Sequence, residues 1–192
     1  MPSDRRSAKI KDVLSQRQPD LSVVMENIHD PHNVSAVLRS CDAVGVMRVE
    51  LLYNVEKFPR LGRKSSSSAN KWLEVRKHKT VDACFDTLRA EGLSICATHL
   101  GREASSLYAT DLTGAIALVF GNEHRGVSEE ASEKADRNIY IPMVGMIQSL
   151  NVSVACAVTL YEAFRQRLQS GRGASRIPAN RMEELYAEWI KR

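Results

Sequence analysis

The sequence IYIPMVGMIQSLNVSVACAVTLYEAFRQRL occupies residues 139–168 and joins a short apolar strand to a long helix. Ile139, Tyr140 and Ile141 form an apolar run typical of a strand. The helix is indicated by apolar residues that recur at steps of three and four, and we predict that they form one face packed in the core. This predicted core face consists of Leu150, Val154, Val158, Tyr161, Phe164 and Leu168.

The segment between this strand and helix is rich in residues that shape loops. Pro142 and Gly145 favour a tight, non-repeating backbone, and Ser149, Asn151 and Ser153 bring polar groups to the helix start. Because the first turn of a helix leaves backbone amides without partners, the junction is suited to hold a polar ligand. An ordinary strand-to-helix loop with Ser149 as the N-cap explains the same residues, and this stretch alone does not separate the two interpretations.

The composition fits one domain with short extensions. A chain of 192 residues with 43% hydrophobic content is long enough to bury one core. Its apolar runs are too short to span a bilayer, and its N-terminal region has charges where a signal peptide needs an apolar segment, which favours a cytoplasmic location. The cysteines show no metal-ligand spacing, so we predict buried free thiols at Cys41, Cys84, Cys96 and Cys156.

Positive charge is concentrated at the two ends of the chain. Residues 1–17 hold five basic and two acidic side chains, residues 163–176 hold four basic and none acidic, and residues 18–162 have a net charge of −3. Basic ends predict contacts with a nucleic acid, although they also occur as plain solvated surface. The end residues that we predict to bind RNA are Arg5, Arg6, Lys9, Lys11, Arg165, Arg172 and Arg176.

Strands that alternate with helices predict an α/β fold, with a mainly parallel sheet covered by helices on both faces. The predicted helices span residues 3–16, with Ser3 as cap, 32–44, ending at Gly45, and 81–90. The predicted strands span residues 21–25, 48–53, 72–75, 93–97, 115–120 and 139–141. Between them, residues 54–71 form a long loop whose basic side chains suit contacts with phosphate, namely Arg60, Arg63 and Lys64.

A last helix is expected after Pro178, with Asn180 and Glu183 at the spacing of a capping box. Its apolar stripe is too large to stay in water, so it must dock on its own chain or on a partner chain. The stripe comprises Met182, Leu185, Tyr186, Trp189 and Ile190. We therefore divide the chain into a basic helical extension at 1–17, a main domain at 18–168, and a linker with a terminal helix at 169–192.

Three polar segments follow predicted strands, and parallel strands bring their carboxyl ends to one edge of a sheet, where ligands bind. These segments are Thr98–Leu100, Gly121–Glu123 and Pro142–Asn151. A fourth segment, NIHDPHNVSAVLRSC at residues 27–41, carries Asn33 and Arg39 on its predicted helix. The predicted architecture therefore collects the three strand-end segments in one crevice, and we take the segment with Asn33 and Arg39 as the other half of the site.

Taken in order, residues 27–41, 118–127 and 139–153 resemble the three motifs of the SPOUT class of RNA methyltransferases, and within it the TrmH-type tRNA (guanosine-2′-O)-methyltransferases. The resemblance covers nearly the whole chain. It implies a C-terminal trefoil knot, S-adenosylmethionine as methyl donor, a homodimer paired through the knot region, and a D-loop guanosine of tRNA as the target.

The resemblance also implies roles for individual residues. Gly121 would let the backbone approach the cofactor, and backbone groups around Ile141, Met146 and Leu150 would hold its adenine. The full set predicted to bind the cofactor is Thr98, His99, Leu100, Gly121, Asn122, Glu123, Ile141, Met146, Ser149, Leu150 and Asn151. Within this set, Glu123 is expected to organise its loop rather than to act as a base.

Asn33 and Arg39 are the predicted catalytic residues, and the resemblance gives Arg39 the role of activating the ribose hydroxyl. A guanidinium is essentially never deprotonated, so physical chemistry favours a different part for Arg39, in which it orients a phosphate and stabilises alkoxide charge. A structural pairing of Arg39 with Asp30 or with a helix terminus is the alternative.

Other kinds of site fit the sequence less well. Gly121–Ser128 has the glycine spacing of a phosphate loop, but Val127 stands where that motif requires lysine, and no GxGxxG follows a strand. His29 and His32 lack a third ligand, so no metal site is predicted. The competing functions are methylation of ribosomal RNA or of another tRNA position, and a non-catalytic RNA-binding protein with the same fold.

Overall fold

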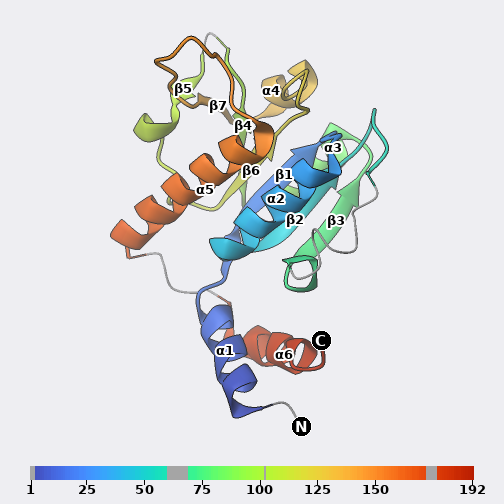
Figure 1. The fold of residues 1–192 in the computed structure, drawn as a ribbon, viewed down its shortest axis with the longest axis vertical. Coiled ribbons are helices and arrows are strands. Elements are labelled where there is room, and N and C mark those ends of the chain that lie inside the picture. The colour runs from blue at the N-terminus through green and yellow to red at the C-terminus, as the bar shows by residue number, and fades with distance from the viewer. Residues whose placement is uncertain (1–2, 60–68, 102, 172–176) are drawn as a thin grey trace.

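The computed structural model describes residues 3–59, 69–101, 103–171 and 177–192 (Figure 1). Its centre is a seven-stranded sheet with the order β3-β2-β1-β6-β4-β7-β5. Every described strand pair is parallel, as predicted. The strands are β1 (Gln18–Glu26), β2 (Val46–Leu52), β3 (Glu74–His78), β4 (Ser94–Thr98), β5 (Ser105–Ser106), β6 (Ile116–Phe120) and β7 (Arg137–Tyr140).

Helices cover both faces of the sheet, because its strands carry apolar side chains on both sides. Met25 of β1 packs in the cluster that contains α2 (Pro31–Ala43) and α5 (Val152–Gln169). Its neighbour Val24 packs in the opposite cluster, with α3 (Val81–Ala90) and α4 (Glu129–Lys134). The alternation follows from the two-residue period of a strand. Figure 1 shows α2 and α5 side by side on one face of the sheet.

The two terminal helices pack together at one end of the molecule (Figure 1). α1 (Asp4–Ser15) starts at the predicted cap, Ser3, whose side chain accepts a hydrogen bond from the Arg6 amide. Ile10 and Leu14 of α1 form a buried cluster with Leu185 and Trp189 of α6 (Ala179–Trp189). The apolar stripe of α6 therefore docks on α1 of its own chain, which decides between the two possibilities that the sequence left open.

Several predicted boundaries are wrong, each for a local reason. β1 begins at Gln18, which pairs with Val46 of β2. The pairing shifts register between Gln18 and Ser22, and this irregularity tolerates Pro19 inside the strand. β3 begins at Glu74, while Trp72, expected in that strand, packs on Trp189 with ring centroids 5.0 Å apart. The capping box of α6 is not formed, since the helix begins at Ala179 with Pro178 at the cap and without a side-chain cap bond.

The predicted core face of α5 is wrong for its outer half. Val154, Tyr161 and Leu168 are 46%, 53% and 53% exposed, and Leu150 precedes the helix, although Val158 and Phe164 do pack against the core. The helix instead buries a face with small and polar members, namely Cys156, Thr159, Leu160, Glu162, Ala163 and Arg167. Arg167 is fully buried because its guanidinium donates to Asp20 Oδ1 at 2.7 Å and to backbone carbonyls of residues 112, 114 and 20.

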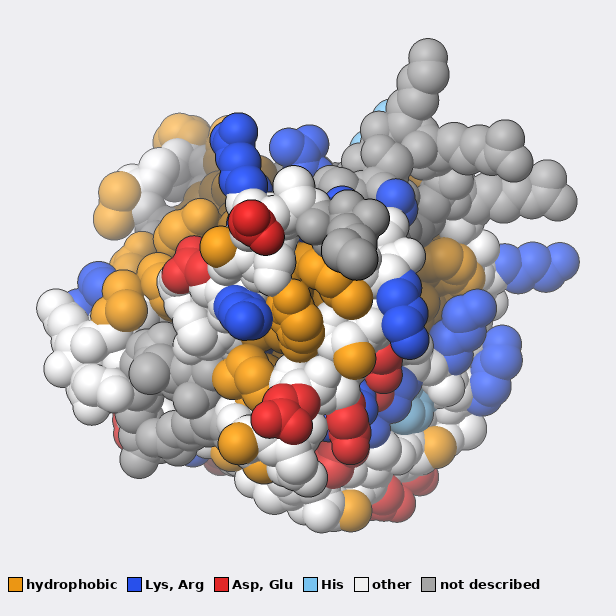
Figure 2. All heavy atoms as spheres, turned by 90° about the horizontal axis from the view of Figure 1, so that it is seen from below, with side chains coloured by type: hydrophobic (Ala, Val, Ile, Leu, Met, Phe, Trp, Pro, Cys, Tyr) orange, Lys and Arg blue, Asp and Glu red, His pale blue; other side chains and the backbone are white. Residues whose placement is uncertain are grey.

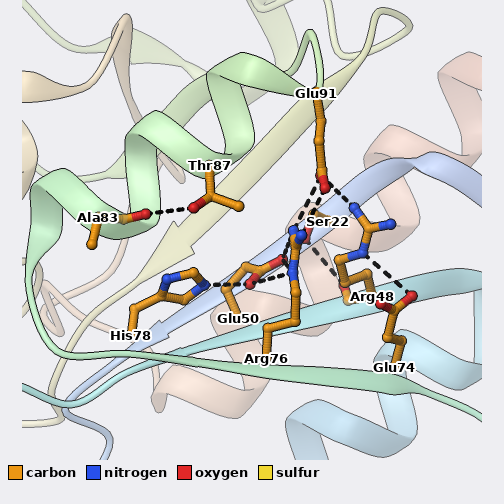
Figure 3. Close-up of polar contacts among 9 residues, drawn as sticks. All are labelled: Ser22, Arg48, Glu50, Glu74, Arg76, His78, Ala83, Thr87 and Glu91. Atoms are coloured by element: carbon orange, nitrogen blue, oxygen red, sulfur yellow. Dashed lines mark hydrogen bonds and ion pairs between the residues drawn. The ribbon is translucent and has the colours of Figure 1, made fainter.

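An ion-pair network joins β2, β3 and the end of α3 (Figure 3). The carboxylate of Glu50 is fully buried. Its Oε1 atom accepts a hydrogen bond from the Arg76 guanidinium at 2.5 Å, and its Oε2 atom lies 2.7 Å from Nε2 of His78. Arg76 also pairs with Glu91, and this hydrogen bond holds the pKa of Glu91 below its ordinary value. This network was not predictable from the sequence, because its members come from separate elements.

The four cysteines are free and buried, as predicted. Burial raises the pKa of the Cys84 and Cys96 thiols to about 12, so both stay protonated and unreactive at neutral pH. None of the helices in the described ranges is both long and apolar enough to cross a membrane.

Candidate active site

The predicted crevice lies at the carboxyl edge of the sheet, where β1, β6, β4 and β7 are neighbours. The segments that leave these strands begin at Asn27, Gly121, His99 and Ile141. The parallel arrangement brings together four segments that are far apart in sequence, in the position where open α/β sheets bind ligands.

Glu123 connects the segment after β6 to the start of α2. Its carboxylate accepts hydrogen bonds from the backbone amides of His29 at 3.0 Å and Asp30 at 3.1 Å, and from Asn33 Nδ2 at 2.9 Å. Burial raises the pKa of Glu123, but the hydrogen bonds from Asn33 and the backbone amides outweigh burial and hold the pKa below its ordinary value. Glu123 is therefore a carboxylate at neutral pH, where it organises this loop as expected.

Asn33 extends the connection to the start of α5. Its Oδ1 atom accepts a hydrogen bond from Asn151 Nδ2 at 3.0 Å, and Asn33 is 9% exposed. Asn151 Oδ1 in turn accepts from the Ser153 amide at 2.9 Å, so Asn151 is the N-cap of α5. The expectation of Ser149 as cap is thus wrong, because the helix begins three residues later. Glu123, Asn33 and Asn151 form one chain of hydrogen bonds, which we call the amide–carboxylate chain.

Asn27 and Asn122 form a second link that sequence reasoning missed. Asn27 has a positive φ of 51°, and its carbonyl accepts a hydrogen bond from Asn122 Nδ2 at 2.8 Å. Its Oδ1 atom accepts from the amides of Val55 and Glu56 after β2. Asparagine tolerates this left-handed conformation better than most residues, so an asparagine directly after a buried strand was the available signal.

Gly121 occupies a position where the chain folds closely back on itself. Asn122 and Gly126 exchange backbone hydrogen bonds of 2.9 and 2.8 Å, which closes residues 122–126 into a tight loop. A Cβ atom on Gly121 would lie 2.1 Å from the carbonyl carbon and oxygen of Gly126 and from the amide nitrogen of Val127. Glycine is required there by the chain's own backbone, independently of any ligand.

Arg39 lies exposed on α2, further along the helix than Asn33. No residue within the described ranges forms a hydrogen bond or an ion pair with its side chain. Asp30, the alternative partner, instead caps α2 by accepting a hydrogen bond from the His32 amide at 2.8 Å. The guanidinium of Arg39 is thus not held in a structural pair with Asp30.

The other residues predicted to bind the cofactor surround the same edge without joining the amide–carboxylate chain. Thr98 Oγ1 donates to the Val119 carbonyl at 2.8 Å, and the His99 amide donates to the Ile139 carbonyl at 3.1 Å. Leu100 and Met146 are 73% and 98% exposed. Side chains of His99 and Asn122 also line a cavity of about 560 Å³ beside Glu26 and Ser128, which the segment from Ile141 to Leu150 does not reach.

The predicted RNA-binding residues are placed unevenly. Arg5, Arg6, Lys9 and Lys11 are exposed on α1. Arg165 is on α5 and forms an ion pair with Glu162 at 2.8 Å. The remaining ones lie outside the described residues, namely Arg60, Arg63, Lys64, Arg172 and Arg176.

His29 and His32 do not form a metal site with each other in the structure. The His29 ring lies 3.9 Å from Glu56, and the His32 amide takes part in the cap of α2. In the described part of the chain, no group of three or more His, Cys, Asp or Glu side chains is arranged to hold a metal ion.

Comparison with known proteins places this geometry in one family. The model of the SpoU rRNA methylase family matches residues 20–161. A tRNA (guanosine(18)-2′-O)-methyltransferase of Thermus thermophilus is 42% identical over 99% of this chain and 98% of its own length. The crystal structure of the A. aeolicus TrmH/SpoU tRNA modifying enzyme is 35% identical, with a TM-score of 0.90, and covers 98% of this chain and 96% of the other.

A more distant structure shares the fold. The SpoU methyltransferase AviRb from Streptomyces viridochromogenes, solved in complex with the cofactor AdoMet, is 23% identical with a TM-score of 0.71. It matches 81% of this chain and 62% of the other. With a family model that matches residues 20–161 and a relative of 42% identity along nearly the full length, the chain belongs to the SpoU rRNA methylase family.

Proposed function

We propose that this enzyme transfers a methyl group from S-adenosylmethionine to the ribose 2′-hydroxyl of the D-loop guanosine at position 18 of tRNA. The observation that carries the proposal is the amide–carboxylate chain, which joins all three sequence motifs at one edge of the sheet through Glu123, Asn33 and Asn151. The choice of tRNA is supported by the Thermus thermophilus and A. aeolicus relatives, whose names give this class of substrate. A tRNA substrate places the reaction in the cytoplasm.

The segment between β7 and α5 fits the adenine and ribose of the cofactor. Residues 142–150 form no regular element, and their backbone groups make no hydrogen bond to another described residue. Such amides and carbonyls are available to a polar ligand, and Met146 and Leu150 offer apolar surface beside them. Bound there, S-adenosylmethionine supplies a methyl group that its sulfonium already activates, so the transfer requires no metal.

Arg39 and Asn33 take separate parts in this proposal. Asn33 holds the loop of Glu123 and the start of α5 in register, which shapes the crevice. Arg39, whose guanidinium has no partner among the described residues, orients a phosphate of the RNA and stabilises the negative charge that grows on the 2′-oxygen. The hydroxyl proton passes to that phosphate rather than to Arg39, because a guanidinium has no basic site to accept it.

Incubation of the protein with unmodified tRNA and S-adenosylmethionine, followed by mapping of the methylated nucleotide, tests the function directly. We expect a single 2′-O-methylguanosine in the D-loop. Methylation of ribosomal RNA or of another tRNA position would replace the proposed target. Binding of tRNA without any methyl transfer would favour the non-catalytic alternative and overturn the proposal.

We also propose that the main domain, residues 18–168, contains a trefoil knot in its C-terminal part. The supporting feature is the position of β7, which pairs with β4 on one side and with the earlier β5 on the other. The last strand of the chain thus lies between two strands that come earlier in the sequence, and α5, which follows it, packs on α2. Threaded connections of this kind are rare outside knotted folds.

A homodimer is the oligomeric state that we propose. Exposed apolar side chains run from the segment after β7 along α5, and a second copy of the chain is the proposed cover. They are Val144, Met146, Ile147, Leu150, Val154, Tyr161 and Leu168. The stripe of α6, for which a partner chain was one of two expected docking sites, is already buried against α1, so substitution of Leu185 and Trp189 would disturb that packing instead.

Sedimentation equilibrium should therefore give twice the monomer mass for the parent. Substituting Val154→Asp together with Tyr161→Asp should shift the protein to monomers without loss of folded structure, because both side chains are exposed in one chain. Val75→Asp, at an exposed position on β3, is the matched control and should stay dimeric. A monomeric parent would refute the dimer, and a dimeric double variant would place the interface elsewhere.

A further inference from the structure

A cavity of about 560 Å³ opens at the end of the molecule formed by α1 and α6, away from the crevice. Figure 2 looks at this end and shows hydrophobic side chains in the middle, with Lys and Arg side chains on either side. The cavity has no lining residue in common with the amide–carboxylate chain. Its lining consists of Ser3, Arg5, Arg6, Lys9, Ile10, Val13, Arg17, Asp42, Trp72 and Trp189. We call it the α1 cavity.

The floor of the α1 cavity is apolar and aromatic. Trp72 is half-buried, and its ring contacts Trp189 with centroids 5.0 Å apart and planes inclined by 56°. Trp189 is 4% exposed and Ile10 is 6% exposed, so Trp72 is the aromatic ring of the floor that a ligand in the cavity can contact. An indole face of this kind stacks with a nucleic-acid base of any sequence.

The rim of the α1 cavity is basic and its charges are not compensated. Arg5, Arg6 and Lys9 are exposed on two turns of α1, and no described residue forms an ion pair with them. Like charges so close on one helix repel each other, which an anionic ligand would relieve. The single carboxylate of the lining, Asp42, is already paired with Arg17.

Arg17 makes the wall of the α1 cavity rigid. It is fully buried, donates to the Val46 carbonyl at 2.7 Å, and lies over the Trp189 ring at 5.1 Å from its centroid. Its Nε atom is buried without a hydrogen-bond partner in the described structure. A buried cation that fixes an aromatic floor is a built feature rather than a gap between loosely packed helices.

We propose that the α1 cavity holds one unstacked nucleotide of the bound RNA, with the base on Trp72 and a phosphate on Arg5, Arg6 and Lys9. The inference rests on the proposed function and adds to it a second anchoring point outside the crevice. Asp42 at the end of α2 and Asn33 at its start are nine residues apart, which is about 14 Å along a helix. Arg39, the residue of α2 that the proposed function places on the RNA, is three residues before Asp42, so the two sites engage neighbouring parts of one RNA.

The chain contains two tryptophans, Trp72 and Trp189, which makes the floor observable by fluorescence. In the Trp189→Phe variant, all tryptophan emission comes from Trp72. Saturating tRNA should quench this emission and shield it from acrylamide. In the Trp72→Phe variant, the remaining emission of the buried Trp189 should change much less. Unchanged Trp72 emission at a tRNA concentration that supports methylation would overturn the proposal.

Affinity measurements test the rim with a matched pair of lysines. Lys9→Gln removes a charge that lines the α1 cavity. Lys11→Gln removes a charge from the same helix that was also predicted to bind RNA, but Lys11 does not line the cavity and its Nζ lies 5.3 Å from the Tyr186 ring centroid. We expect Lys9→Gln to weaken tRNA binding severalfold and to lower its salt slope by about one, whereas Lys11→Gln costs twofold or less. Trp72→Leu should weaken binding about tenfold, as loss of one stacked base does.

The rate at saturating tRNA separates this proposal from the proposed function. Lys9→Gln and Trp72→Leu should raise KM for tRNA and leave the single-turnover rate near that of the parent, because neither residue touches the crevice. If the Lys9→Gln and Lys11→Gln variants bind tRNA with equal affinity and the parent methylates tRNA, the proposed role of the α1 cavity is refuted. If the parent methylates no tRNA, the proposed function fails instead.

Discussion

Substitution of Arg39 by alanine should lower the single-turnover rate of methyl transfer by about two orders of magnitude or more, the usual cost of losing an electrostatic catalytic group. S-adenosylmethionine affinity should stay nearly unchanged, because the segments proposed to hold the cofactor follow β4, β6 and β7 rather than α2. The exposed guanidinium has no described partner, so its removal breaks no structural pair. The rate is measured with saturating tRNA and the affinity by calorimetry.

Arg39→Lys separates the two roles considered for this side chain. A phosphate clamp that also stabilises charge should retain part of its effect with lysine, since the point charge remains and the bidentate fork is lost. If the side chain must accept the proton, lysine, with its lower pKa, should recover activity as the pH rises. Ser40→Ala is the control on the same helix, because in the described part of the chain Ser40 Oγ donates only to the Ala36 carbonyl. A near-parental rate for Arg39→Ala would show that Arg39 is not catalytic.

Gly121→Ala should have the largest effect on the architecture of the crevice. The added methyl group would meet backbone atoms of Gly126 and Val127 at 2.1 Å, and backbone cannot move aside as a flexible side chain can. Overpacking of this kind costs about 1–3 kcal/mol or more of unfolding free energy. Because the clash displaces Asn122 and Glu123, we expect cofactor binding to be lost even in molecules that fold.

Urea unfolding and calorimetric titration with S-adenosylmethionine measure the two effects of Gly121→Ala. Gly114→Ala is the matched control, since a Cβ atom there meets nothing within 4 Å and the backbone conformation suits alanine. The control should match the parent within about 0.5 kcal/mol, the usual range for surface substitutions. A Gly121→Ala protein with parental stability and affinity would contradict the close backbone approach.

The fold was predictable because its signals are local. Apolar runs such as Ile116–Phe120 and turn residues such as Gly45 mark the strands and helices, and their alternation dictates a parallel sheet. The same reasoning placed residues 98–100, 121–123 and 142–151 at one edge, while residues 27–33 were assigned to the site only through the family resemblance. It could not supply the hydrogen bonds between Glu123, Asn33 and Asn151, because partners separated by about a hundred positions leave no periodic pattern.

Predictions about which side chains are buried failed where helices carry mixed faces. The stripe of Val154, Tyr161 and Leu168 follows a helical period, but periodicity does not say which face meets the sheet. The buried face contains Arg167, a charged residue that is not part of the apolar stripe. Burial of that guanidinium depends on carbonyls from residues 20, 112 and 114, which become neighbours only in the folded chain.

The contact between α1 and α6 joins two segments that lie far apart in the sequence. Ile10 and Leu14 have their apolar partners, Leu185 and Trp189, about 170 positions later, so this surface stays uncovered until α6 has been synthesised. The α1 cavity, which needs Trp189 in its floor, can form only after α6 has been synthesised and has packed on α1. Prematurely terminated chains would therefore lack the second RNA anchor and would expose an apolar face that proteases and chaperones recognise.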